Sequence, residues 1–273
     1  IRETDAILHV IRCFDDDNIV HVDGSVDPIR DKETIDIELQ LKDLEAVQKK
    51  IEKVSRSART GNKEAQKELE LLLKLKNGLE KSINVRGLDF TQEERMEFIK
   101  PLQLITDKPV LYVCNVSESD ALNGNSYVDS VRDSISNESA EILFLAVSIE
   151  ADINELDSFE EKKIFLDDLG LEESGSNKLI RASYKLLNLH SYFTAGVKEV
   201  RGWTIKIGDS AYDAAGQIHT DFQKGFICAE VIAYDDYVEL GSESKIKEAG
   251  KMRLEGKEYI VSDGDIMHFR FNI

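Results

Sequence analysis

Three apolar runs in the first 150 residues predict strands that are buried on both faces, as in a parallel α/β sheet. They occupy residues 6–14, 110–114 and 142–147. A helical pattern over residues 127–136 lies between the second and third runs. Strand, helix and strand in that order imply a right-handed parallel crossover. The pattern therefore predicts an open sheet with helices on its faces.

A long helical hairpin is predicted between the first two strands. From residue 33 to 59 the apolar positions step by three and four, and the same stepping resumes over residues 65–79 after Gly61 and Asn62. Two such arms joined by a short turn form an antiparallel coiled coil. At 1.5 Å per residue the first arm spans roughly 40 Å, which is too long for an ordinary crossover helix. We therefore interpret residues 33–87 as an insertion.

Helical signals continue after the hairpin. Thr91 and Glu94 have the spacing of a capping box that starts a helix running toward Pro101. The acidic tract 150–173 has the composition of solvated helices, and residues 177–187 form one more amphipathic pattern.

From residue 189 onward the elements are short and mixed, which predicts a small α+β module of about 85 residues. An Asp-Gly turn at residues 262–265 joins the last two predicted strands. The expected strands are 200–205, 226–232, 259–261 and 266–271, and the expected helices are 212–220 and 244–254.

The charge is distributed unevenly along the 273 residues. The chain carries a net charge of −18, yet residues 41–87 contain twelve basic and seven acidic residues, a net +5. So acidic a chain would be repelled by a polyanion, whereas its basic hairpin could approach one. The hairpin lysines fit either the solvated face of a coiled coil or an arm that contacts phosphates. On the second reading the contact residues are Lys49, Lys50, Lys53 and Arg56.

Several other classes of protein are excluded by pattern. No apolar run approaches the roughly 20 residues of a membrane span. The three cysteines are far apart in apolar runs, as expected in a reducing compartment. The five histidines lack zinc-site spacing, and we expect no metal ligands in this chain.

One candidate binding motif follows the second strand. In many P-loop nucleotidases an Asn-Lys-x-Asp sequence at a strand's carboxyl end binds guanine. Here the sequence is Asn115, Val116, Ser117, Glu118. Glutamate does not reproduce the two-hydrogen-bond geometry of aspartate, whereas asparagine pairs well with the N6/N7 edge of adenine. The motif predicts weakened guanine preference and tolerance of ATP, although an asparagine that merely caps a turn remains the alternative. Residues Ala146, Val147 and Ser148, after the next strand, form the candidate second base loop.

No phosphate-binding sequence of the GxxxxGK[ST] type occurs between Ile1 and Ile273. The chain also begins with Ile1 rather than methionine. A nucleotidase without a phosphate loop cannot hydrolyse its substrate, so we expect residues 1–273 alone to be inactive in hydrolysis, with no catalytic residue among them.

Taken together, several long segments make the chain resemble the YchF/Obg-like ATPase family of P-loop NTPases. The base-recognition residues 115–118 are part of this resemblance. The other segments that carry it are residues 1–6, 9–14, 150–152, 185–189, 192–201, 218–222, 225–227 and 248–253.

The resemblance implies a nucleotide-binding domain (residues 1–32 and 88–188), a helical-hairpin insertion (33–87) and a C-terminal TGS domain (189–273). It also implies that the N-terminal part of the nucleotide-binding domain, with the phosphate loop and the magnesium ligands, precedes Ile1. The implied fold class is α/β, the remainder of a P-loop NTPase sheet with the inserted hairpin and a β-grasp-like α+β module.

The implied function is a cytoplasmic, ribosome-associated ATPase. Its cofactors would be ATP, with GTP as the alternative, and Mg²⁺. Its partners would be the ribosome or ribosomal RNA, with no membrane and no DNA sequence specificity. A non-catalytic RNA- or ribosome-binding module is the competing hypothesis.

Overall fold

The computed structural model describes residues 1–138, 140–196 and 199–272, and it divides into two compact units, Ile1–Ser183 and Tyr184–Ile273. Val197 and Lys198, within the resemblance segment 192–201, lie outside the described residues. No helix in the described part of the chain is long and apolar enough to cross a membrane.

The first unit contains the predicted parallel sheet. Its strands are β1 (Ile7–Arg12), β2 (Val110–Asn115) and β3 (Glu141–Leu145), with β2 in the centre. Both pairings are parallel, as the apolar runs predict. Five of the six β2 residues are buried, whereas β1 leaves Leu8 and Val10 exposed.

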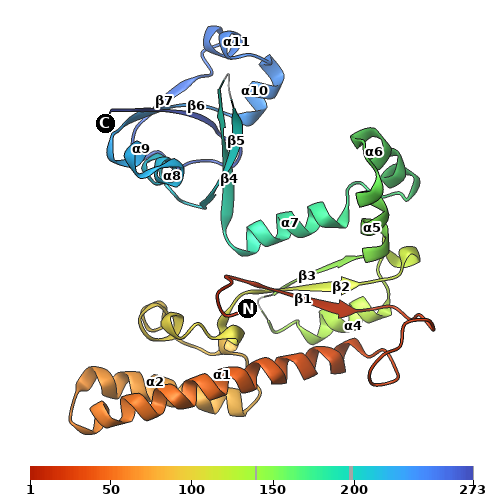
Figure 1. Ribbon diagram of the computed structural model, residues 1–273, viewed down its shortest axis with the longest axis vertical. Coiled ribbons are helices and arrows are strands. Elements are labelled where there is room, and N and C mark those ends of the chain that lie inside the picture. Colours follow the sequence, from red (N-terminus) through yellow and green to blue (C-terminus); the bar gives the residue numbers. More distant parts are fainter. Residues whose placement is uncertain (139, 197–198, 273) are drawn as a thin grey trace. The chain divides into compact units, whose positions relative to one another are not determined.

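The hairpin is confirmed. Helix α1 (Pro28–Arg59) and helix α2 (Lys63–Glu80) lie side by side and antiparallel (Figure 1). Asp27 caps α1 by accepting hydrogen bonds from two backbone N–H groups, and Asn62 caps α2 by accepting one, from the N–H of Ala65. The arms share an apolar core that includes Val47, Leu72 and Leu75.

A series of short helices leads from the hairpin to β2. The capping box of Thr91 and Glu94 is confirmed at the start of α3 (Gln92–Glu94). The chain then passes through a π-helical turn, η2 (Arg95–Ile99). Three 3₁₀ turns complete the series, and these are η1 (Val85–Gly87), η3 (Lys100–Leu102) and η4 (Ile105–Asp107).

Helices after β2 cover the sheet. The predicted crossover helix is α4 (Ser126–Ser134), and its Val128 and Val131 pack in the sheet core. The 3₁₀ turn η5 (Glu118–Asp120) precedes it. The acidic tract forms α5 (Val147–Glu155) and α6 (Phe159–Asp168), and the amphipathic pattern forms α7 (Gly175–Leu186). The boundary between the two units falls within α7.

The second unit is an α+β module with a five-stranded mixed sheet in the order β5-β4-β8-β6-β7. These strands are β4 (Leu189–Ala195), β5 (Val200–Lys206), β6 (Phe226–Ile232), β7 (Arg253–Glu255) and β8 (Ile266–Phe271). The helices are α8 (Ala211–Ile218), α9 (Thr220–Lys224), α10 (Tyr234–Leu240) and α11 (Glu243–Glu248). The core lies between α8 and the sheet.

In this unit two predicted helices are present but end earlier than expected, and one predicted strand is wrong. The predicted helix 244–254 ends at Glu248, because Gly250 takes a positive φ of 67° and the chain then enters β7. Residues 259–261 form no strand, and Ile260 makes only an isolated bridge with Ser210. The predicted helix 212–220 is interrupted at His219, whose extended backbone and ring nitrogen cap α9.

The predicted fold class is confirmed as α/β with an inserted hairpin and a small α+β module. The division at residues 32, 87 and 188 stays a prediction.

Candidate functional site

The two loops predicted to bind a base lie side by side in the first unit. Asn115 is the last residue of β2, and its side-chain Oδ1 accepts a hydrogen bond of 3.1 Å from the backbone N–H of Val147. The N–H of Val116 donates to the carbonyl of Leu145 at 3.0 Å. Both loops follow carboxyl ends of parallel strands, which is where ligands bind in open α/β sheets. The asparagine therefore joins the two loops.

Of the six candidate base-binding residues, two are buried, three are exposed and Asn115 is half-buried. The side chains of Val116 and Ala146 are only 3% exposed and pack in the sheet core, so these two residues can offer a ligand only their backbone. Glu118, Val147 and Ser148 are exposed. A bound base would therefore meet the amide of Asn115, the carboxylate of Glu118 and the surface of the second loop.

A set of hydrogen bonds fixes the loop that follows Asn115. Asp120 accepts hydrogen bonds of 2.8 Å from the Ser117 hydroxyl and from the Asn125 amide. The same Asn125 amide donates to the carbonyl of Cys13, just beyond β1, and the Asn125 Oδ1 caps α4 at Val128. The ends of β1 and β2 and the start of α4 are thus held together by two side chains.

Helix α5 starts at Val147 and carries a further residue that sequence reasoning missed. The Glu150 carboxylate accepts hydrogen bonds from the backbone N–H groups of Gly175 (2.6 Å) and Ser176 (2.9 Å) and from the Ser176 hydroxyl (2.6 Å). Gly175 and Ser176 are the first residues of α7. The contact spans 25 positions of sequence, so no local pattern could reveal it.

The basic residues of the hairpin do not all lie on one surface. Lys49, Lys53 and Arg56 are exposed and follow one another at spacings of four and three, which places them on one face of α1. Lys50 instead pairs with Glu68 of α2 at 2.8 Å. The structure brings together three of the four predicted contact residues, and the fourth holds the two arms together.

A polar network joins the base of the hairpin to the sheet. Lys32 contacts Asp36 at 2.9 Å and Glu138 at 3.1 Å, and Glu138 also binds Arg86 and the Tyr112 hydroxyl. Burial alone would lower the pKa of Lys32, but its hydrogen bond and charge interaction with Asp36 raise it. Burial raises the pKa of Tyr112 to about 12. A cavity of about 1050 Å³ is lined by Lys32, Asp36, Arg86 and Glu138, and it also reaches Pro109, before the amino end of β2 and thus away from Asn115.

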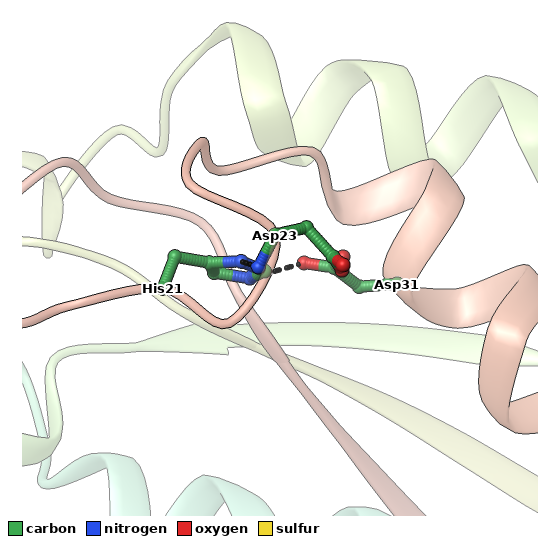
Figure 2. A group of neighbouring side chains, drawn as sticks. All are labelled: His21, Asp23 and Asp31. Atoms are coloured by element: carbon green, nitrogen blue, oxygen red, sulfur yellow. Dashed lines mark hydrogen bonds and ion pairs between the residues drawn. The ribbon is translucent and has the colours of Figure 1, made fainter.

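His21, Asp23 and Asp31 form a cluster near the start of α1 (Figure 2), with side-chain ligand atoms all within 4.8 Å of one another. His21 Nε2 lies 2.9 Å from an Asp31 oxygen, and His21 Nδ1 accepts the N–H of Asp23 at 3.2 Å. The Arg30 guanidinium binds Asp31 at 3.0 Å and approaches Asp23 at 3.7 Å.

This cluster does not fit a metal ion. A ring nitrogen that accepts an N–H carries no proton, so the other nitrogen carries it and donates to Asp31, which leaves no lone pair for a metal. The nearby guanidinium already balances the carboxylates. Mg²⁺ in particular prefers oxygen ligands in octahedral geometry. We interpret the cluster as the support of the first turn of α1.

The fold of the first unit and its two loops together define a class of protein. The first unit is an open α/β fold with a parallel sheet, a hairpin insertion and an asparagine-linked loop pair at the carboxyl edge of its strands, where folds of this class bind their ligands.

Known proteins agree with this class. The family model YchF-GTPase_C, described as a protein of unknown function, matches residues 189–272. The "Ribosome-binding ATPase YchF" of Bacillus subtilis (strain 168) is 51% identical over 275 residues, which cover 100% of this chain and 75% of that protein. The protein of the same name from Escherichia coli O157:H7 is 50% identical, with 100% and 74% covered.

A solved structure, the Schizosaccharomyces pombe YchF GTPase, superposes with a TM-score of 0.84 at 37% identity and covers 98% of this chain and 73% of that one. The chain belongs to the YchF family.

Proposed function

We propose that the protein is a ribosome-associated P-loop NTPase of the YchF type that binds and hydrolyses ATP, with Mg²⁺ as the ion that accompanies the nucleotide. The observation that carries the proposal is the hydrogen bond between Asn115 and Val147, which joins both candidate base loops. The names of the bacterial relatives, ribosome-binding ATPases, support the same function. Ribosome association would make the protein cytoplasmic.

Asn115 suits adenine. Its Nδ2 group can donate to N7, while Oδ1 has two lone pairs and can accept from the adenine amino group in addition to Val147. Glu118 stands where guanine-binding motifs have an aspartate, so we propose relaxed or lost guanine specificity. In this proposal the base site lies among the described residues, and no phosphate loop or magnesium ligand is assigned within residues 1–273.

The experiment is to titrate the full-length protein with ATP and, separately, with GTP. We expect ATP to bind at least as tightly as GTP. Asn115→Ala should weaken ATP binding by about 1–3 kcal/mol, the value of a two-hydrogen-bond base contact. Glu155→Gln, at an exposed position on α5, is the matched control. A clear preference for GTP in the wild-type protein would refute the assignment.

The hairpin face formed by Lys49, Lys53 and Arg56 supports a second candidate function, a non-catalytic module that binds the ribosome or its RNA through the hairpin and a TGS domain at residues 189–273. Residues 1–273 would then bind ribosomes without nucleotide, and the affinity would fall steeply with salt because phosphate contacts release counterions. Cosedimentation at several salt concentrations measures this directly. Ribosome binding that requires ATP would favour the first function instead.

A further inference from the structure

Glu150 links the second base loop of the proposed nucleotide site to the start of helix α7. On one side it belongs to the first turn of α5, the helix that begins in the second base loop at Val147. On the other side its carboxylate contacts the first turn of α7, and the chain continues from α7 into the second unit. Figure 1 shows α5 and α7 as separate helices of the chain.

The contact with α7 satisfies the free donors at the start of that helix. A helix leaves its first N–H groups without partners. In α7 the N–H groups of Gly175 and Ser176 bond to Glu150, and that of Asn177 bonds to the Ser174 hydroxyl at 3.2 Å. Helix α7 has no acidic residue in its own first turn, so Glu150 supplies the negative charge that the helix dipole favours there.

The backbone of α7 also approaches this site so closely that only glycine fits. A Cβ atom at Gly175 would lie 2.7 Å from the Leu145 Cβ and 2.9 Å from the Glu150 Oε1. Leu145 is the last residue of β3 and directly precedes the base loop. Two independent features, the three hydrogen bonds and the absent side chain, therefore hold the start of α7 against the base loop.

The base loop itself is held from its other end by Asn115, through the N–H of Val147. Val147 and Glu150 are three residues apart on α5, so a displacement of the loop moves both. A continuous series of contacts runs from Asn115 through Val147 and Glu150 to Gly175 and Ser176.

We propose that Glu150 is a positioning residue that couples base binding at Asn115 to the start of α7. The proposal rests on the proposed function, since the base site must be occupied for the coupling to act. A base that orders the loop strengthens the contact of Glu150 with α7, and that contact favours base binding by the same factor, because coupling between two sites is reciprocal.

The first measurement needs no nucleotide. Amide hydrogen exchange at Gly175 and Ser176, followed by NMR, should accelerate on the order of tenfold in Glu150→Gln, because hydrogen bonds to a charged acceptor are stronger than those to a neutral amide. Ser176→Ala, which removes only the hydroxyl, tests the same contact with less risk to folding. The control Glu155→Gln should leave both rates unchanged. Unchanged exchange in Glu150→Gln overturns the proposal.

The second measurement adds nucleotide to the full-length protein. ATP should slow exchange at Gly175 and Ser176 in the wild type, and this effect should shrink in Glu150→Gln. That variant should also bind ATP severalfold more weakly while binding inorganic tripolyphosphate, which has no base, as the wild type does. Equal weakening for both ligands, or an ATP affinity equal to that of the wild type, overturns the coupling.

The two measurements also separate this proposal from the proposed function. A wild-type protein that binds no ATP refutes the function and the coupling together, whatever the exchange rates are. ATP binding with wild-type strength in Glu150→Gln leaves the function intact and refutes only the role of Glu150.

Discussion

Asp43 of α1 accepts two hydrogen bonds from one residue, Thr106, through its backbone N–H at 2.7 Å and its hydroxyl at 2.9 Å. A third comes from the N–H of Ile105 at 2.9 Å, and the Asp43 side chain is fully buried. Thr106 lies in η4, directly before β2. The hairpin is therefore attached through one carboxylate to the strand that ends at Asn115.

Asp43→Ala should destabilise the first unit strongly. The substitution would leave the Ile105 and Thr106 donors buried without acceptors, and each such group costs about 1–3 kcal/mol. We expect a total loss of about 3 kcal/mol, measured as a lower urea midpoint followed by circular dichroism at 222 nm. Asp43→Asn, which keeps one acceptor oxygen, should lose less. Glu45→Ala, exposed on the same helix, should change the free energy of unfolding by less than about 0.5 kcal/mol.

Gly225→Ala should destabilise the second unit. A Cβ atom there would lie 2.1 Å from the carbonyl oxygen of Asn272, and the two residues are also joined by a backbone hydrogen bond of 2.9 Å. Backbone has to move to make room, which we expect to cost about 2 kcal/mol. The single tryptophan, Trp203 in β5, reports on this unit by fluorescence.

The matched control for that substitution is Gly256→Ala. A Cβ atom at Gly256 has no heavy atom within 4 Å among the described residues outside its immediate chain neighbours. We expect its unfolding midpoint to match the wild type. Equal destabilisation by both variants would show that the contact with Asn272 is not the cause, since the loss of glycine flexibility in the unfolded chain would by itself stabilise the fold.

The first half of α1 shows why part of the fold could not be predicted from apolar periodicity. The buried residues of this half are mostly polar, and they occupy one face of the helix. These residues are Lys32, Asp36, Gln40 and Asp43. After Pro28, the first apolar residue of α1 that is fully buried is Val47, and the apolar face starts with the partly buried Leu44. The predicted start at residue 33 therefore falls five residues late, although Asp27 and Pro28 form an ordinary helix start.

The second unit shows a related limit. Strand β4 was not predicted, because its polar residues His190, Ser191 and Thr194 hide the alternation, and its pairing with β5 and β8 decides its conformation. The apolar residues 259–261 have the composition of a strand, yet the Tyr259 hydroxyl donates to Asp265 at 2.7 Å and the segment stays outside the sheet ladders. In both segments, β4 and residues 259–261, the conformation is determined by contacts with residues that are distant in the sequence.

The candidate site was predictable only where its residues follow strands that the sequence pattern reveals. Asn115 and the loop 146–148 follow strands that apolar runs reveal, so their proximity could be inferred from the topology of parallel sheets. Glu150 and Gly175 carry no such signal. Their relationship depends on where α7 packs, which the intervening 24 residues determine.

Stability of the first unit should fall as the pH drops below about 6.5 because of His9 in β1. Burial lowers the pKa of His9, and the charges of Lys32 and Arg86 add to this effect while Asp36 and Glu138 oppose it. The unfolded chain therefore takes up a proton near pH 6.5, before the folded protein does, so the unfolded state gains stability as the pH falls.

Urea midpoints measured between pH 7.5 and 5.5 test this expectation. His9→Gln should flatten the decline, whereas His268→Gln, at an exposed position in β8, should preserve it. A decline of the same slope in His9→Gln would assign the pH dependence to other groups.

Reversal of the hairpin face should weaken ribosome binding through electrostatics alone. The slope of log affinity against log salt is negative. We expect Lys49→Glu, Lys53→Glu and Arg56→Glu together to reduce the magnitude of this slope by about 3, since each lost phosphate contact removes about one unit. Lys50 is left unchanged, because glutamate there would face Glu68 and disturb the packing of α1 on α2. The control carries the same change in net charge at exposed positions elsewhere in the first unit, with Lys100, Arg132 and Lys163 replaced by glutamate. If both triple variants reduce the slope equally, net charge rather than the hairpin governs binding; if only the first does, the hairpin face contacts phosphate.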